Sequence, residues 1–242
     1  MAGHSKWANI RHRKGAQDAK RGKIFTKIIK EITVSARIGG GDLDSNPKLR
    51  KAVSKARSNN VPQDNIIRAI KKGTGELGGV AYEEMSYEGY GPNGIAILIE
   101  VITDNKNRTV SELRHILNKN NGSLAERGSV AWMFERKGEI IISDFQGDEE
   151  KLFQDILDSG ADNFEIAEKN VIVTTDQSNL LDSRDELGNK GYMIKSADLK
   201  MVPKSFQKID DNDDQEKINK LMEIIDNHED VNNVYSNFIF IS

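Results

Sequence analysis

The chain has 242 residues, no cysteine and a formal net charge of −3 at pH 7. This length suits one large domain or two to three small ones, and the lack of cysteine excludes disulfides and cysteine-ligated metal sites. No apolar run approaches the roughly 20 residues that a membrane helix needs, and the start lacks the apolar core of a secretory signal. We therefore expect a cytoplasmic protein without a membrane partner.

Charge is unevenly distributed along the chain. Residues 1–72 carry 18 Lys and Arg against 5 Asp and Glu, whereas residues 73–242 carry 17 against 33. A strongly basic segment concentrates polyanions near its surface, so the sequence predicts a nucleic-acid partner. A solvated basic tail is the alternative, but a plain tail would not need the apolar residues that interrupt the charge, which are Trp7, Ile10, Ile24 and Phe25.

The segment up to residue 73 predicts three short amphipathic helices. Apolar residues at helical spacing place the first over 20–38; they are Ile24, Phe25, Ile28, Ile29, Ile32 and Ala36. Asn46 as cap and Pro47 at the first helical position begin the second helix. Val61-Pro62 begins the third, which Gly73 ends. Three such helices make a small bundle.

A glycine-rich linker at 73–79 follows, and the charge changes sign across it. The remaining chain alternates strand and helix patterns, which is typical of α/β sandwiches. The predicted strands cover 95–102, 129–134, 139–143, 170–175, 192–202 and 234–241. Helices are predicted over 148–159, 177–189 and 214–227, and a capping box at Thr109–Glu112 predicts the start of another.

Motifs that carry catalysis or bind metals are scarce. Gly22-Lys23 lacks the Ser or Thr that completes a phosphate-binding loop, and Asp210–Asp214 lacks the glycine of a calcium loop, which favours a linker and helix cap. Glu88–Gly91 favours a turn over an RNA-binding signature, since Pro92 follows. Asp104–Arg108 fits a surface turn and a functional contact equally well. The histidines show no ligand spacing; they are His4, His12, His115 and His228. We expect no enzyme, no catalytic residue, no metal and no cofactor.

The stretch Gly3–Lys14 differs, because basic residues alternate there with hydrogen-bond donors and one aromatic residue. Lys and Arg suit phosphate contacts, which position a protein on nucleic acid without reading its sequence. Trp7 fits base stacking or anchoring of the arm to the bundle, and we favour anchoring. The candidate nucleic-acid contacts are Lys6, Arg11, Arg13, Lys14, Lys20, Arg21, Lys23, Lys27, Lys51 and Lys55.

This opening resembles that of the YebC/PmpR family. The matching blocks are Gly3–Ile10, Gln17–Lys27, Asn46–Arg50, Arg68–Gly73, Thr103–Thr109, and Gly128–Val130 with Trp132, so the resemblance covers essentially the whole chain. Gly15 and Asn121 depart from the family pattern, where Ala and Gly are expected. The resemblance implies an α+β protein whose three domains surround a central cavity. A basic arm and helical domain spans 1–75, and two ferredoxin-like domains follow, one (136–204) inserted into the other (80–135 plus 205–242).

The resemblance also implies nucleic-acid binding in gene expression. Many family members are described as DNA-binding transcriptional regulators, whereas mitochondrial relatives are described as translational activators of a cytochrome oxidase subunit. We expect a DNA-binding transcriptional regulator, with an RNA- or ribosome-associated translation factor as the alternative. The sequence favours that alternative in two respects: it contains no obvious recognition helix and no obvious dimerisation device. A nuclease ranks last, and the oligomeric state stays open.

Overall fold

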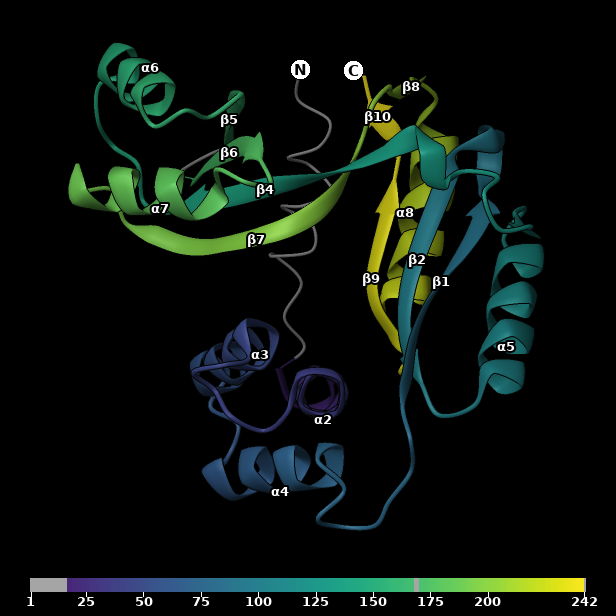
Figure 1. Cartoon of the computed structure of the whole chain (residues 1–242). Helices are drawn as coiled ribbons and strands as arrows, with labels where there is room; N and C mark the ends of the chain where they lie inside the picture. The colour runs from purple at the N-terminus through teal and green to yellow at the C-terminus, as the bar shows by residue number, and fades with distance from the viewer. Residues whose placement is uncertain (1–16, 168–169, 242) are drawn as a thin grey trace. The chain divides into compact units, whose positions relative to one another are not determined.

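The structure, a computed structural model, describes residues 17–167 and 170–241, and side chains in these ranges apart from those of 17–21 and 167. The described chain forms two compact units (Figure 1): one holds residues 17–129 and 216–234, and the other holds residues 130–215 and 235–241. The predicted α+β fold class is confirmed. The finer division into three domains stays a prediction. None of the helices in the described ranges is long and apolar enough to cross a lipid bilayer.

Three helices begin the first unit: α2 (Gln17–Gly39), α3 (Pro47–Ser58) and α4 (Gln63–Gly73). They share an apolar cluster that includes Ile28, Ile32, Leu49, Val53 and Ile66. The buried side chain of Asn46 accepts a hydrogen bond from the backbone N–H of Leu49 at 3.0 Å and donates to the backbone oxygen of Ser35 at 2.9 Å. One side chain therefore caps α3 and fastens it to α2, and the predicted cap is confirmed.

The same unit contains a four-stranded sheet in the order β3-β1-β2-β9. Its strands are β1 (Glu83–Tyr90), β2 (Ala96–Thr103), β3 (Ser123–Ala125) and β9 (Val231–Ser236), and a short 3₁₀ turn (η1, Pro92–Gly94) joins β1 to β2. Two helices belong to this sheet, α5 (Lys106–Lys119) and α8 (Asn212–Asp226), and they bury Leu113, Leu117, Ile218, Leu221, Met222 and Ile225. Strand β2 is buried almost throughout, as its run of apolar residues predicts.

The second unit contains a ferredoxin-like sheet in the order β5-β6-β4-β7. Its elements alternate along the chain as β4 (Phe134–Ile142), α6 (Glu149–Asp158), β5 (Asn163–Ala167), β6 (Asn170–Asp176), α7 (Leu180–Asn189) and β7 (Ile194–Pro203). Both helices pack on one face, where Ile140 and Val173 are paired across β4 and β6. A 3₁₀ turn (η2, Ala131–Met133) precedes β4, and β8 (Gln207–Ile209) pairs in parallel with β10 (Phe238–Phe240).

Several predicted boundaries are wrong, for reasons that the structure supplies. Helix α5 begins at Lys106 rather than near Thr109, because the side chain of Asn105 accepts a hydrogen bond from the backbone N–H of Arg108 and caps the helix one turn earlier. Glu88–Tyr90 ends strand β1 instead of forming a turn, and the turn follows at η1. The predicted strand at 234–241 is two strands, β9 and β10.

The predicted cap at the start of α8 is present, since the side chain of Asp211 accepts a hydrogen bond from the backbone N–H of Asp214 at 2.9 Å.

Candidate nucleic-acid interface

Helices α3 and α4 form a closely connected pair. Four residues join them, 59–62, and within this turn Asn60 adopts a left-handed backbone conformation with φ of 56°. Asparagine tolerates this conformation better than most residues with a side chain. The next residue, Val61, is only 6% exposed and belongs to the apolar cluster of the bundle. A turn this short, held to the bundle by the buried side chain of Val61, fixes the direction in which α4 leaves α3.

The outer faces of this pair are basic. Residues 47–73 contain eight Lys and Arg and one acidic residue, Asp64. Some of these cations have partners: Lys48 lies 2.6 Å from Glu84, and Lys55 lies 2.8 Å from Glu31. Arg50 donates to the backbone oxygen of Leu43 at 2.8 Å.

Four other cations on α3 and α4 are exposed: Arg57, Arg68, Lys71 and Lys72. Within the part of the chain that the structure describes, their side chains make no hydrogen bond or ion pair. Arg68, Lys71 and Lys72 follow one another at helical spacing on α4, so they lie on one side of that helix. We call these four residues the free basic surface. Because no carboxylate of the described residues forms an ion pair with these four cations, this surface is suited to phosphate.

The structure locates the sequence-predicted contacts in different places. Lys6, Arg11, Arg13 and Lys14 lie outside the described residues, and so do the side chains of Lys20 and Arg21 on α2. Lys51 is exposed on α3, and Lys55 has the ion pair given above. Lys23 and Lys27 reach the end of α8, where their ammonium groups donate to the backbone oxygens of Asn227 at 3.3 Å and Asp226 at 2.5 Å. Cations stabilise the carbonyl end of a helix, so these two lysines already have an intramolecular role.

A buried carboxylate next to α8 fastens the helical bundle to the sheet. Asp230 precedes β9, and its side chain is fully buried. It lies 2.7 Å from Lys30 of α2 and 2.8 Å from Arg108 of α5, and it accepts a hydrogen bond from Thr109 at 2.8 Å. We call Asp230 with these three partners the Asp230 hub. Burial opposes ionisation of Asp230, but the hydrogen bonds from Arg108, Lys30 and Thr109 outweigh it and lower its pKa to about 2.

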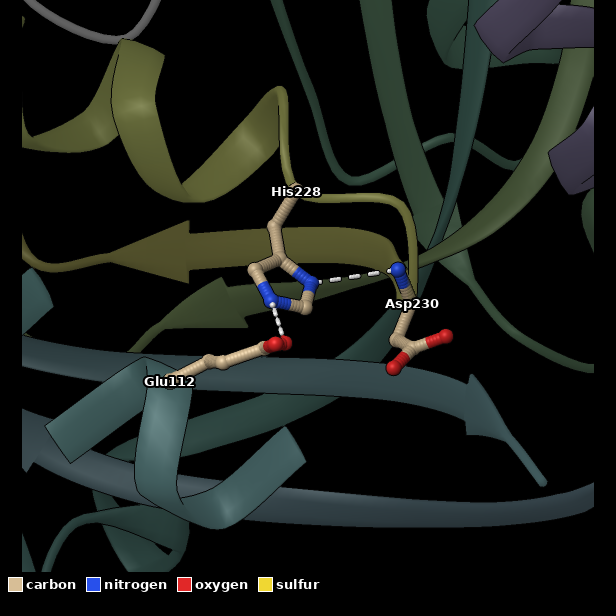
Figure 2. A group of neighbouring side chains, drawn as sticks. All are labelled: Glu112, His228 and Asp230. Carbon is tan, nitrogen blue, oxygen red and sulfur yellow. Dashed lines mark hydrogen bonds and ion pairs between the residues drawn. The ribbon is translucent and has the colours of Figure 1, made fainter. Parts of the chain in front are cut away.

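His228 and Glu112 adjoin the hub, and Figure 2 shows them with Asp230. Ligand atoms of the three residues lie within 4.8 Å of one another, which is compatible with a metal site. Both imidazole nitrogens already have partners, however: Nδ1 accepts from the backbone N–H of Asp230 at 3.1 Å, and Nε2 donates to Glu112 at 2.9 Å. Two cations also face the Asp230 carboxylate, so a metal ion would be repelled there. The grouping fits a structural role better than metal binding.

The lowered pKa of Asp230 predicts how stability depends on pH. A carboxyl group with a lowered pKa stabilises the fold fully above its ordinary pKa of 3.8 and loses that effect as pH falls towards 2. We expect the difference in free energy of unfolding between the natural protein and Asp230→Asn to shrink by about 2 kcal/mol between pH 5 and pH 2. Urea unfolding of both proteins across this range measures it. A difference that stays constant would contradict the assignment.

Sequence reasoning missed two features of this region. It did not identify the tight turn between α3 and α4, although the pair Asn59-Asn60 between two amphipathic helices was a signal for one. It also found no neighbours for His228, because Glu112 lies 116 residues away in the chain. Spacing along a sequence carries no information about a contact of that kind.

Comparison with known proteins identifies the family. One family model, the TACO1/YebC protein N-terminal domain, matches residues 5–76, and another, the TACO1/YebC second and third domain, matches residues 82–238. A probable transcriptional regulatory protein of Geobacter sulfurreducens is 53% identical over 238 residues, covering 98% of this chain and 96% of the relative. One from Halothermothrix orenii is 50% identical over 242 residues, covering 98% and 95%. The crystal structure of a conserved hypothetical protein from Aquifex aeolicus matches with a TM-score of 0.85 and 40% identity over 95% of both chains. The chain therefore belongs to the TACO1/YebC family, as its opening residues predict.

Proposed function

We propose that this protein is a non-enzymatic, cytoplasmic regulator of gene expression that binds duplex DNA through its N-terminal helices. The observation that carries the proposal is the free basic surface on a helix pair with a four-residue turn. Two helices with a connection of this length resemble a helix-turn-helix motif, in which the second helix enters the major groove. Similar proteins are named probable transcriptional regulatory proteins, which agrees with this role.

The basic arm would extend the same contact. Lys6, Arg11, Arg13 and Lys14 are close in sequence to α2, and basic segments bind phosphates without reading bases. In this proposal the arm supplies affinity, and α3 and α4 set the orientation on the duplex. Because phosphate contacts release counterions, such binding must weaken steeply with salt.

The test is a salt titration of binding to mixed-sequence duplex DNA. If about six phosphates are neutralised, log affinity should fall with log salt at a slope of roughly −5. The quadruple variant Arg57→Ala/Arg68→Ala/Lys71→Ala/Lys72→Ala should reduce the steepness by roughly 2–3, and the arm should account for the rest. The matched control is Arg136→Ala/Lys195→Ala/Lys204→Ala/Lys208→Ala, which removes the same charge from exposed residues of the other unit. Its slope should remain that of the natural protein.

Equal slopes for the two variants would mean that only net charge matters, and the interface on α3 and α4 would be wrong.

A competition between purified ribosomes and genomic duplex fragments distinguishes a transcriptional regulator from a translation factor. Retention on ribosomes, with only sequence-blind and salt-sensitive DNA binding, would replace the DNA-binding proposal with a translation factor. Cleavage of nucleic acid after Mg²⁺ is added would overturn the non-enzymatic part.

A further inference from the structure

The outer face of α4 is not uniformly basic. Ile66, Ala69 and Gly73 are its buried residues. The opposite side of the helix therefore presents Asp64, Ile67, Arg68 and Lys71 to solvent. Ile67 is 42% exposed, which places an apolar side chain among charged ones. Asp64 lies in the first turn of α4, where a carboxylate also suits the helix dipole. A surface that only contacts phosphates gains nothing from the apolar side chain of Ile67.

Both exceptions have a function if α4 lies in a major groove. A carboxylate is repelled by phosphate, but it accepts a hydrogen bond from the amino group of cytosine, and an apolar side chain contacts the methyl group of thymine. Arginine donates two hydrogen bonds to guanine, which is the commonest specific contact in this groove. Asp64 and Arg68 lie one helical turn apart, so they face the same side. Lys71 and Lys72, in the last turn of α4, would contact the phosphate backbone of the DNA.

We propose that α4 reads sequence in the major groove of duplex DNA, with Arg68 recognising guanine, Asp64 the amino group of a cytosine, and Ile67 a thymine methyl group. This inference rests on the proposed function and adds sequence specificity to it. Charge complementarity selects the occupant, because Arg68 and the two lysines beyond it are exposed and make no ion pair within the described residues. The target class is therefore a duplex site that contains a G·C pair.

Selection from a random duplex library with the full chain at physiological salt tests the inference. The natural protein should enrich a defined site. Replacing one G·C pair of that site with A·T should weaken its binding roughly tenfold or more. With Arg68→Ala, the same replacement should have almost no effect. Arg68→Lys keeps the charge but not the paired donors, so it should retain the salt slope and lose the base preference.

The matched control is Lys72→Ala, which should weaken binding to all sequences equally and lower the steepness of the salt slope by roughly 0.9. Two results would overturn the inference alone: duplex binding without enrichment of any site, or an unchanged base preference in Arg68→Ala. Absence of duplex binding by the natural protein would instead overturn the proposed function, so the two failures are distinguishable. Far-UV circular dichroism checks that each variant is folded.

Discussion

Replacing Asp230 with asparagine is expected to lower the free energy of unfolding by about 3–5 kcal/mol at pH 7. The side chain of Asp230 is fully buried, and that of its partner Lys30 is only 9% exposed. Without the carboxylate, the ammonium group of Lys30 stays buried beside a neutral amide, and burying an uncompensated charge is costly. Arg108 loses a hydrogen-bond acceptor at 2.8 Å in the same change. Urea unfolding followed by far-UV circular dichroism measures the loss.

The neighbouring variant Asp104→Asn is the matched control. Asp104 also forms an ion pair with Arg108, at 2.9 Å, but both side chains are about a third exposed. Exposed pairs contribute about 0–1 kcal/mol, so this variant should unfold close to the natural protein. A double variant, Lys30→Met/Asp230→Asn, should recover part of the loss because the buried charge is gone. If Asp230→Asn and Asp104→Asn were equally stable, the hub would not hold the bundle to the sheet.

The parts of the fold that the sequence could predict are those determined by local signals. Helices α3 and α4 depend on local signals, namely the cap at Asn46, Pro47 after it and the stop at Gly73, and all of these were readable. Strand β2 was readable as one uninterrupted apolar run. Each of these features is decided by residues within a few positions of one another. The alternation of strand and helix patterns indicated only sandwiches of strands and helices, and the α+β arrangement with ferredoxin-like domains was implied by the family resemblance.

The contacts of Asp230 were not readable, because its partner Lys30 lies 200 residues away. Asp230 is also one of 38 acidic residues, and nothing in its sequence neighbours marks it as buried. The start of α5 was predicted wrongly for a related reason. Thr109 has the sequence context of a helix cap, but its hydroxyl is buried against Asp230, and Asn105 caps the helix instead. Lys27 looked like a free phosphate contact for the same reason, since the end of α8 that it meets is far away in the chain.

The candidate interface was predictable in charge but not in geometry. The count of Lys and Arg shows that the first 72 residues are the basic part of the chain. Counting cannot separate Lys55, which has Glu31 as a partner, from Arg68, which makes no ion pair within the described residues. Within the turn between α3 and α4, Asn60 has a left-handed conformation and the next residue, Val61, is buried. That burial appears only once the three helices are packed.

The position of α4 depends on a close approach to α2 at Gly73. A Cβ atom added there would lie 2.7 Å from the Cβ of Ala36 and closer still to the backbone oxygen of Thr33. Gly73→Ala therefore forces the two helices apart. Since overpacking costs about 1–3 kcal/mol and the obstacle here is backbone, we expect a loss near 3 kcal/mol in free energy of unfolding, measured by urea unfolding.

Gly22→Ala is the matched control for this prediction. Gly22 lies within α2, and among the described residues no atom outside the adjacent backbone of this helix lies within 4 Å of the added Cβ. Alanine is a better helix former than glycine, so this variant should be more stable by about 0.5–1 kcal/mol. Replacement by alanine is thus expected to lower the free energy of unfolding at Gly73 and to raise it at Gly22. Because α4 carries three of the four residues of the free basic surface, Gly73→Ala should also weaken duplex binding, whereas Gly22→Ala should not. A Gly73→Ala protein as stable as the natural one would show that α4 is not fixed by this contact.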